Sequence, residues 1–265
     1  NRKLPIITLL TDFGLIDPYV ASMKGVILSI NPRSTLVDIT HQVSSHDIRE
    51  GAFTLAQAYS TFPKGTIHLA VVDPGVGSPR KPALFVTKNY FFVGPDNGLF
   101  TLALKKEKLK KAIALSKKEF FLPTVSSTFH GRDVFAPVAA YLSLGVKPES
   151  FGPSIKSWHQ MAFPNPAVKQ GKLTGEIVHV DAFGNLVSNI DRKDLLQFSK
   201  GRPFVIKIAK RIMRGLKKGY WEGRKDEPMA LIGSGGFLEI SVREKNAQKA
   251  LRAKKGTRVV VRAGV

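Results

Sequence analysis

Apolar residues in the first half of the chain follow two alternating patterns. Continuous runs at 5–10, 35–39 and 66–72 contain β-branched residues and predict buried strands. Between the first two runs, apolar residues recur at helical spacing, and Asn31-Pro32 ends this helix. A second helix is expected from Asp47 to Tyr59, because Asp47 and Glu50 have the spacing of a capping box. Strands alternating with helices predict a largely parallel sheet with right-handed crossovers.

The pattern then changes towards shorter elements. Residues 83–87 and 90–93 predict a hairpin, and Pro95-Asp96-Asn97-Gly98 is typical of a turn. Residues 134–144 predict a helix in which Pro137 is tolerated near the start.

The stretch 147–171 carries Pro148, Pro153, Pro164 and Pro166 and predicts a linker between domains. Short β-like runs follow it, at 173–180, 186–190, 203–208, 238–242 and 257–262. Such runs, separated by turn residues, predict a small antiparallel barrel or sandwich. We therefore expect an α/β protein with an N-terminal α/β domain over 1–165 and a smaller C-terminal β-barrel-like domain over 166–265.

Composition limits the kind of protein. With 265 residues the chain can form one large or two modest domains, and its 43% hydrophobic share is ordinary for a soluble protein. No apolar run is long enough to span a bilayer, and we see no signal peptide. Cysteine is absent, which excludes disulfides and thiolate chemistry and fits a reducing compartment. We expect a cytoplasmic location.

The charge balance is unusual, since 41 Lys and Arg residues face 20 Asp and Glu residues and give a net charge of +21. Such a charge favours association with polyanions such as RNA. The excess is spread over 105–118, 200–225 and 243–258, without interleaved aromatic residues or a nucleic-acid module. A basic, solvated surface is the plainer interpretation and the one we favour, because net charge alone reports function poorly.

Two carboxylates follow predicted parallel strands. Asp12 comes after the first strand and Asp73 after the third. Ligands of open parallel sheets bind beyond the carboxyl ends of the strands, so a pair of carboxylates at one edge favours a site. Taken singly, Asp12 could instead cap its own loop, and Asp73 could form a turn with Pro74-Gly75.

Arg80 and His130 could complete this site. Arg80 follows Asp73 by seven positions across a glycine-rich loop, and could hold that carboxylate ionised instead of forming an ordinary surface ion pair. His130 precedes a predicted helix and is a plausible proton carrier, although a lone histidine is more often packed or solvated. Arg132-Asp133 is interpreted as a structural pair or helix cap. The other histidines lack metal-ligand spacing, so we expect no metal site.

Two glycine-containing segments stand out in the C-terminal half. Asp181-Ala182-Phe183-Gly184-Asn185 and Gly233-Ser234-Gly235-Gly236 could be two turns. Alternatively, Phe183 could stack on a flat ring while Asp181 and Asn185 supply hydrogen bonds. Neither a P-loop nor a dinucleotide fingerprint follows the first strand. The sequence therefore has no evident loop that would bind the phosphates of a cofactor.

Several long motifs occur together in one order. They are Thr11-Asp12-Phe13-Gly14, Asp17-Pro18-Tyr19-Val20, Lys24-Gly25, Val72-Asp73-Pro74-Gly75-Val76-Gly77, Val93-Gly94-Pro95-Asp96-Asn97-Gly98-Leu99, His130-Gly131-Arg132-Asp133, Asp181-Ala182-Phe183-Gly184-Asn185 and Gly233-Ser234-Gly235-Gly236. In these motifs the chain resembles the S-adenosyl-L-methionine (SAM) hydroxide adenosyltransferases, or SAM hydrolases, which are relatives of the SAM-dependent fluorinase and chlorinase. The resemblance extends over nearly the whole chain.

The resemblance implies a fold, an assembly and a reaction. The fold would be an N-terminal α/β domain and a C-terminal barrel-like domain. The assembly would be a homotrimer that binds SAM between the N-terminal domain of one subunit and the C-terminal domain of the next. Water or hydroxide would attack the ribose C5′ carbon and release adenosine and L-methionine. SAM would be the substrate, and no cofactor would be needed.

The resemblance also implies roles for individual residues. Asp73, Arg80 and His130 would activate the water, with the proton going to either Asp73 or His130. Asp12 would hold the ribose hydroxyls, with Asp17 and Tyr19 nearby. In the C-terminal half, Asp181, Phe183 and Asn185 would line the adenosine site, and Ser234 would help at the methionine end.

Two other functions stay open. A halogenase would need a site with little negative charge, whereas Asp73 stands where the halogenating relatives carry a neutral residue. A non-catalytic protein that binds SAM or a nucleic acid would release no adenosine and, in the second case, would bind RNA in a salt-sensitive way.

Overall fold

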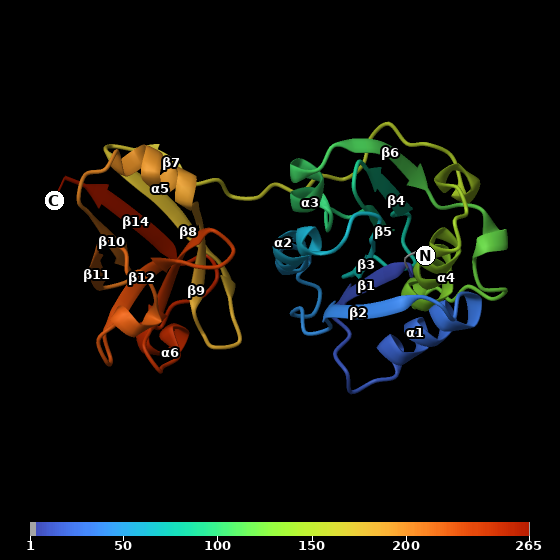
Figure 1. The fold of residues 1–265 in the computed structure, drawn as a ribbon, viewed down its shortest axis with the longest axis horizontal. Coiled ribbons are helices and arrows are strands. Elements are labelled where there is room, and N and C mark those ends of the chain that lie inside the picture. The colour runs from blue at the N-terminus through green and yellow to red at the C-terminus, as the bar shows by residue number, and fades with distance from the viewer. Residues whose placement is uncertain (1–3, 265) are drawn as a thin grey trace. The chain divides into compact units, whose positions relative to one another are not determined.

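The computed structural model describes residues 4–264 of the chain, which divides into two compact units, Asn1–Met161 and Ala162–Val265. Each unit has its own sheet and hydrophobic core, and Figure 1 shows them as one mixed α/β unit and one unit made mainly of strands. In the described range no helix combines the length and the apolar content that crossing a bilayer requires.

The sheet of the first unit has the strand order β2-β1-β3-β5-β4-β6. Its strands are β1 (Ile6–Thr11), β2 (Thr35–Thr40), β3 (Ile67–Val71), β4 (Pro82–Thr87), β5 (Phe91–Pro95) and β6 (Leu109–Ala114). The neighbours β2, β1, β3 and β5 are parallel, whereas β4 is antiparallel to both β5 and β6. The predicted largely parallel sheet is confirmed, as is the predicted hairpin, which is formed by β4 and β5.

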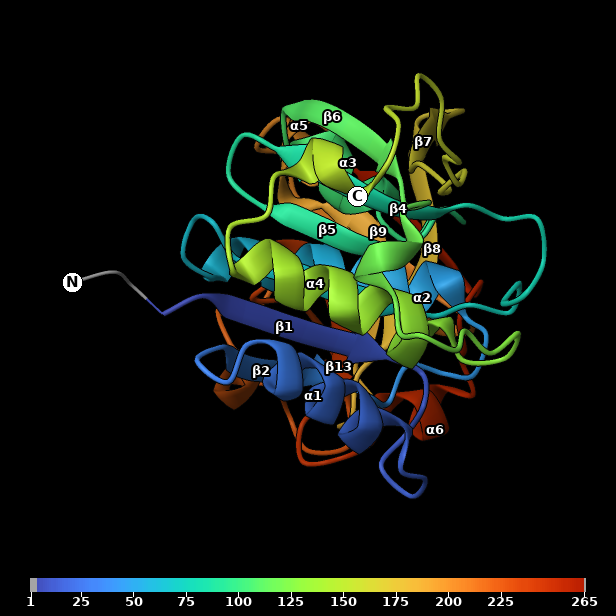
Figure 2. The same cartoon turned by 90° about the vertical axis from the view of Figure 1, so that its right-hand side faces the viewer.

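Helices cover both faces of this sheet. Successive residues of a strand point to opposite faces, and β1 is buried on both sides. Its Leu9 joins the core beneath α1 (Tyr19–Ile30) and α4 (Ala136–Ser143), whereas Leu10 packs with α2 (Ile48–Ala58) and α3 (Thr101–Lys106). Figure 2 shows α1 and α4 along β1. Burial on both faces explains why these strands have continuous apolar runs.

The expected helix cap at Asp47 is present. The Asp47 carboxylate accepts a hydrogen bond of 2.9 Å from the backbone N–H of Glu50, and the Glu50 carboxylate accepts one from Ser44. Aspartate at this position satisfies a backbone donor that the first helical turn leaves free.

The helix predicted over 134–144 begins differently from the expectation. A π-helical turn spans Gly131–Phe135, and α4 follows it. Pro137 lacks a backbone N–H, so the carbonyl of Asp133 is free and accepts instead from the backbone N–H of Leu122, at 2.9 Å. The missing N–H of the proline therefore explains how residue 122 can attach to this turn.

In the second unit a long strand joins two parts of one curved antiparallel sheet, with the order β11-β10-β14-β8-β9-β13-β12. The strands are β7 (Ala167–Lys169), β8 (Lys172–Val180), β9 (Leu186–Asp191), β10 (Phe204–Ile208), β11 (Arg211–Arg214), β12 (Pro228–Ile232), β13 (Phe237–Val242) and β14 (Arg258–Ala263). The first half of β8 pairs with β14 and its second half pairs with β9. This gives the nearly closed, barrel-shaped sheet that the short β-like runs predict.

Several elements were not predicted from the pattern. They are β6, β7, β11, β12, α3, α5 (Arg192–Ser199) and α6 (Ala247–Leu251). The edge strand β11 illustrates why: of its four residues only Met213 is buried, and charged arginines flank it. An edge strand of this kind lacks the apolar run that marks a central strand.

Candidate active site

Asp12 and Asp73 leave the sheet at the same edge. In the parallel pairing of β1 with β3, Thr11 lies opposite Val71, so Asp12 follows the end of β1 and Asp73 follows the end of β3. Neighbouring strands of a sheet are about 4.8 Å apart. The expected placement beyond the carboxyl ends of adjacent parallel strands is therefore present.

The loop after β3 folds Arg80 back onto Asp73. Its turns are closed by backbone hydrogen bonds from Val76 to Asp73 and from Ser78 to Gly75. Gly77 has φ +75°, in the left-handed region that favours glycine, and a Cβ there would collide with the carbonyl oxygen of Ser127. Gly77 thus lets this loop approach the loop that carries His130.

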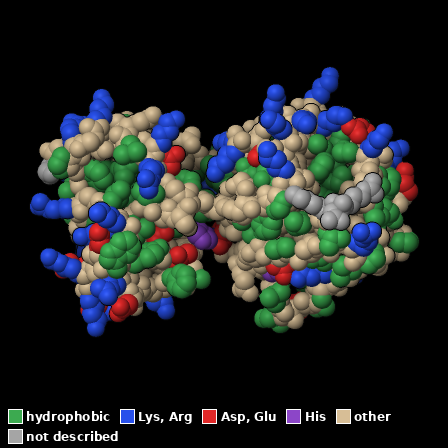
Figure 3. Space-filling view, viewed as in Figure 1, with side chains coloured by type: hydrophobic (Ala, Val, Ile, Leu, Met, Phe, Trp, Pro, Cys, Tyr) green, Lys and Arg blue, Asp and Glu red, His purple; other side chains and the backbone are tan. Residues whose placement is uncertain are grey.

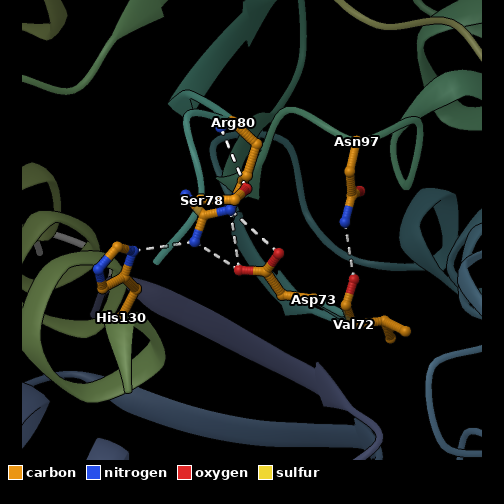
Figure 4. A network of polar contacts seen from close by, with 6 residues as sticks. All are labelled: Val72, Asp73, Ser78, Arg80, Asn97 and His130. Carbon is orange, nitrogen blue, oxygen red and sulfur yellow. Dashed lines mark hydrogen bonds and ion pairs between the residues drawn. The ribbon is translucent and has the colours of Figure 1, made fainter. Parts of the chain in front are cut away.

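Arg80 forms a fork with the Asp73 carboxylate, as Figure 4 shows. Its Nε lies 3.0 Å from Oδ1 and 2.9 Å from Oδ2, and its Nη2 also donates to Oδ2. Both side chains are almost fully buried, with 9% of the Arg80 side chain and 4% of the Asp73 side chain exposed. The guanidinium also lies over the ring of Phe135, 5.3 Å from its centroid. A buried bidentate pair of this kind holds both groups in one geometry.

Arg80 contacts His130 as well. Its Nη2 lies 2.9 Å from Nδ1 of the imidazole, so the guanidinium, which can only donate, requires Nδ1 to accept. Burial, followed by the nearby Arg80 charge, lowers the pKa of His130 below its ordinary value, although Asp73 and Asp133 act in the opposite direction. A neutral His130 therefore carries its proton on Nε2.

Three of the predicted site residues thus form one cluster. Asp73, Arg80 and His130 come from two loops, and Arg80 is the residue that touches the other two. Within the described residues, Nη1 of Arg80 is buried and has no hydrogen-bond partner. The cluster combines a carboxylate, a neutral imidazole and a spare cationic donor.

The Asp12 loop is held by a chain of polar contacts. Oδ2 of Asp12 accepts from the backbone N–H of His46 at 2.8 Å. Thr11 Oγ1 lies 2.8 Å from Nδ1 of the buried His41, whose Nε2 lies 3.0 Å from Asp38. One oxygen of Asp12 is therefore satisfied by a backbone N–H, which belongs to the loop after β2 and not to the loop of Asp12 itself.

Aromatic rings connect the Asp12 loop with the His130 loop. The ring of Tyr19 lies 5.2 Å from that of Phe129 and 5.9 Å from that of Phe13, both in edge-on geometry. Gly131 lies in this group, where a Cβ would come within 3.2 Å of the Phe129 ring. Asp17, the other residue expected nearby, is exposed at the approach to α1.

Arg132 and Asp133 form the structural pair that was expected. Nε of Arg132 lies 2.6 Å from Oδ1 of Asp133, and Oδ2 of this fully buried carboxylate accepts from the backbone N–H of Ser126. The Arg132 guanidinium also lies over the Phe129 ring, 5.0 Å from its centroid. The pair ties the loop before His130 to the π-helical turn after it.

The remaining predicted site residues lie in the second unit, where they form two turns. Asp181 Oδ1 accepts from the backbone N–H groups of Phe183 and Asn185, and Oδ2 accepts from the Asn185 side chain at 2.9 Å. This turn presents the Phe183 ring to solvent, with 79% of the residue exposed. Ser234 is exposed in the turn between β12 and β13.

Some residues that build the site were not singled out from the sequence. Gly77 and His41 are the main examples, since one brings the two loops together and the other holds the Asp12 loop. Asn97 is a third, because its side chain donates to the carbonyl of Val72 at 2.8 Å, next to Asp73. Gly77 and Asn97 both lie in motifs that the family resemblance includes, which is the signal that could have identified them.

Within residues 4–264, no three His, Asp or Glu side chains are grouped as metal ligands would be. The polar groups of the Asp73 cluster instead hydrogen-bond with one another. The chemistry that this geometry offers is the orientation and polarisation of a small oxygen nucleophile.

Comparisons with known proteins agree with this description. Residues 7–152 match the family model of the SAM hydroxide adenosyltransferase N-terminal domain, and residues 175–260 match that of the C-terminal domain. The (R)-S-adenosyl-L-methionine hydrolase of Thermus thermophilus is 37% identical over 254 residues, which cover 93% of this chain and 95% of that protein. The hydrolase of the same name from Methanocaldococcus jannaschii is 39% identical over 259 residues, covering 94% and 92%.

More distant and structural relatives were also found. A fluorinase of Nocardia brasiliensis is 28% identical over 236 residues, or 79% of each chain. The crystal structure of an uncharacterized conserved protein from Thermotoga maritima superposes with a TM-score of 0.91 at 34% identity, covering 97% of this chain and 99% of that one.

Proposed function

The chain belongs to the SAM hydroxide adenosyltransferase family, and we propose that it is an enzyme that hydrolyses SAM to adenosine and L-methionine. The observation that carries the proposal is the buried Asp73–Arg80 pair at the carboxyl end of β3, with the half-buried His130 in contact with Arg80. Full-length relatives named as hydrolases support it.

The reaction is a substitution at carbon. An oxygen of water bonds to C5′ of the ribose while the C5′–S bond breaks, and the electron pair of that bond goes to sulfur. The sulfonium leaves as the neutral thioether of methionine, so it needs no acid to protonate it. The site must orient the nucleophile in line with C5′–S and accept one proton from it.

The hydrogen bonds support a division of roles among the three residues. Nδ1 of His130 accepts from Arg80, so its Nε2–H is a donor that can orient the water oxygen. The Asp73 oxygens keep lone pairs beyond those used by Arg80, which supports Asp73 as the group that accepts the proton. Arg80 fixes both partners, and its buried, unpartnered Nη1 is a further donor for the oxygen nucleophile.

Burial of the cluster suits this reaction. Positive charge on sulfur disappears as the bond to oxygen forms, so a dry site disfavours the charged reactants more than the transition state. Phe135 packs against the guanidinium, and the rings of Phe13 and Phe129 pack together near the His130 loop, so these apolar groups would limit the access of bulk water. Asp12 Oδ1 would accept from the ribose hydroxyls and thereby hold C5′ in place.

Chromatography of SAM after incubation with the purified protein tests the proposal. We expect adenosine and methionine in equal amounts, and a loss of about 10²-fold or more in kcat for Asp73→Asn, since a general base contributes on the order of 10²–10⁴. Asp226→Asn is the matched control, because Asp226 is exposed and pairs with Lys245. An unchanged rate in both Asp73→Asn and His130→Ala would remove these residues from the mechanism.

Halogenation is the competing reaction within the family. The buried Asp73 carboxylate would repel a halide, which favours water as the nucleophile. Incubation with SAM and excess chloride separates the two. Formation of chlorinated nucleoside would overturn the hydrolase assignment.

We further propose a homotrimer in the cytoplasm, in which Asp181, Phe183, Asn185 and Ser234 of a neighbouring copy contact SAM. The exposed Phe183 ring supports a contact with SAM bound to a neighbouring copy. The absence of cysteine from the sequence supports the cytoplasmic location. Light scattering measures the number of copies in the assembly. Cell fractionation shows where the protein is located. If neighbouring copies share each site, mixing inactive Asp73→Asn with inactive Phe183→Ala should restore activity, and no recovery would contradict the sharing.

A further inference from the structure

A hollow on the second unit gathers basic side chains from three neighbouring strands. In β14, Val259 and Val261 are buried, so Arg258, Val260 and Arg262 point to the opposite, outer face. The hollow has a volume of about 420 Å³. Its lining consists of Lys172, Lys207, Ala209, Thr257, Arg258, Val260 and Arg262.

The strand register places the cations close together. Arg262 of β14 lies directly opposite Lys172 of β8, and Lys207 of β10 lies opposite Val260. Arg258 and Arg262 are two residues to either side of Val260, or about 7 Å along the strand. Like charges directly opposite each other destabilise a sheet. A bound anion between them would relieve this repulsion.

Acidic partners are scarce around this hollow. Its lining contains no Asp or Glu, and no ion pair within the described residues involves any of its four cations. Glu176 is the acid that the register brings opposite Arg258, while Arg258 itself donates a long hydrogen bond of 3.5 Å to Thr174. The positive charge is therefore largely uncompensated.

We propose that this hollow, which we call the basic face (Lys172, Lys207, Arg258 and Arg262), binds the phosphodiester backbone of a nucleic-acid strand. Two guanidinium groups and two ammonium groups match phosphate oxygens, and arginine can bind a phosphate through two donors at once. A strand with a phosphate on every nucleotide can engage cations spaced along β14, which a single small anion cannot. The net charge of +21 adds long-range attraction for such a polyanion.

The surroundings of the basic face support a polyanion as its partner. Figure 3 shows Lys and Arg side chains scattered over the visible surface of both units. The lining has no aromatic ring on which a base could stack. The contacts are therefore to the backbone, so binding is tolerant of sequence, steeply dependent on salt, and in the micromolar range, about 10⁻⁶ M, typical of non-specific complexes.

The test compares two variants with the same change in net charge. The first replaces the four cations of the basic face: Lys172→Gln, Lys207→Gln, Arg258→Gln and Arg262→Gln. The second replaces four exposed lysines at the end of α3, in β6 and between the two: Lys105→Gln, Lys106→Gln, Lys108→Gln and Lys110→Gln. Fluorescence anisotropy with a labelled single-stranded RNA of mixed sequence measures affinity over a range of salt concentrations. The double variant Lys207→Gln/Arg258→Gln, which keeps the Lys172 and Arg262 pair, is the reserve if the fourfold variant unfolds.

The basic-face variant should bind RNA about tenfold or more weakly than the unmodified protein, and its slope of log affinity against log salt should be smaller by roughly 3. The α3–β6 variant should bind as the unmodified protein does to within about threefold, and both variants should hydrolyse SAM normally. Equal losses in the two variants would show diffuse attraction and overturn the proposal. Tight binding of tripolyphosphate at the basic face without RNA binding would also overturn it. Because binding is measured without SAM, its failure is distinct from failure of the hydrolase assignment.

Discussion

Nη2 of Arg80 lies 2.9 Å from Nδ1 of His130, a contact between residues fifty positions apart in the sequence. It fixes the tautomer of the imidazole, and through the fork on Asp73 it also fixes the orientation of the carboxylate relative to the ring. The Arg80 guanidinium therefore positions both of the groups that could orient a water molecule or accept its proton. Removing the guanidinium should therefore disturb the positions of Asp73 and His130 together.

Arg80→Lys should lower kcat by about 10²-fold or more while changing KM little, because an ammonium cannot reproduce the planar fork or reach His130 at the same time. Steady-state kinetics with SAM measures both constants. Arg224→Lys is the control: Arg224 is exposed in the second unit, where it pairs with Glu227, and this variant should stay within about threefold of the unmodified kcat. A kcat for Arg80→Lys equal to that of the control would show that the fork is not needed.

The rate of hydrolysis should fall only in acid. The pKa of His130 is lowered by burial and by Arg80, so the imidazole is neutral at pH 7 and becomes protonated below its ordinary value of 6.5. Protonation fills Nδ1, and the hydrogen bond from Arg80 is lost. A pH–rate profile should thus have its acid midpoint below pH 6.5.

NMR titration of His130 gives the same pKa without turnover. In Asp73→Asn the midpoint should move lower still, since the Asp73 charge acts to raise this pKa. A midpoint above 6.5 in the unmodified protein would contradict the assignment of a neutral imidazole.

Gly77→Ala should lower kcat by about 10- to 100-fold, because a Cβ would collide with the Ser127 carbonyl and push the Arg80 loop away from the His130 loop. Gly65→Ala separates this effect from backbone strain alone. Gly65 also has a left-handed φ, of +90°, yet a Cβ there meets nothing within 4 Å. If both variants lose stability but neither loses kcat, the close approach of the loops is not needed for the reaction.

Stability should fall in acid because of His68. This fully buried residue lies among Tyr59, Tyr90 and Phe92, with Nδ1 2.7 Å from Thr8 Oγ1, and burial lowers its pKa from 6.5 to about 3. The unfolded chain binds a proton below pH 6.5 that the folded chain binds only near pH 3. The free energy of unfolding should therefore drop by up to about 1.4 kcal/mol per pH unit across this window.

Urea unfolding at several pH values measures this slope. His68→Asn, which keeps a polar group for Thr8, should be less stable overall but have a shallower slope. His159→Gln, a change in an exposed histidine, should leave the slope unchanged. An unaltered slope in His68→Asn would exclude His68 as its source.

Chelation should leave hydrolysis intact. The departing sulfur of SAM becomes neutral without help from a Lewis acid, and Arg80 and His130 supply the donors for the nucleophile. Desalted protein in excess EDTA should keep its rate to within about twofold. A loss of rate that added Mg²⁺ or Zn²⁺ restores would show that a metal takes part.

Local patterns along the chain predict many of the secondary-structure elements and the candidate residues. The buried strands β1 and β3, the Asp47 cap and the main strands of the second unit follow from apolar runs and turn residues, which act over a few neighbouring positions. The ordered motifs identified the family and selected Asp73, Arg80 and His130 as a set.

The contacts between distant segments follow only from the folded structure. The Arg80–His130 contact, the approach of Gly77 to Ser127, and the gathering of Lys172, Lys207, Arg258 and Arg262 on one face depend on strand order and register. These are set by packing between segments far apart in the chain, which no local pattern encodes. For this reason the basic charge looked diffuse along the sequence, whereas the folded sheet concentrates part of it in one hollow.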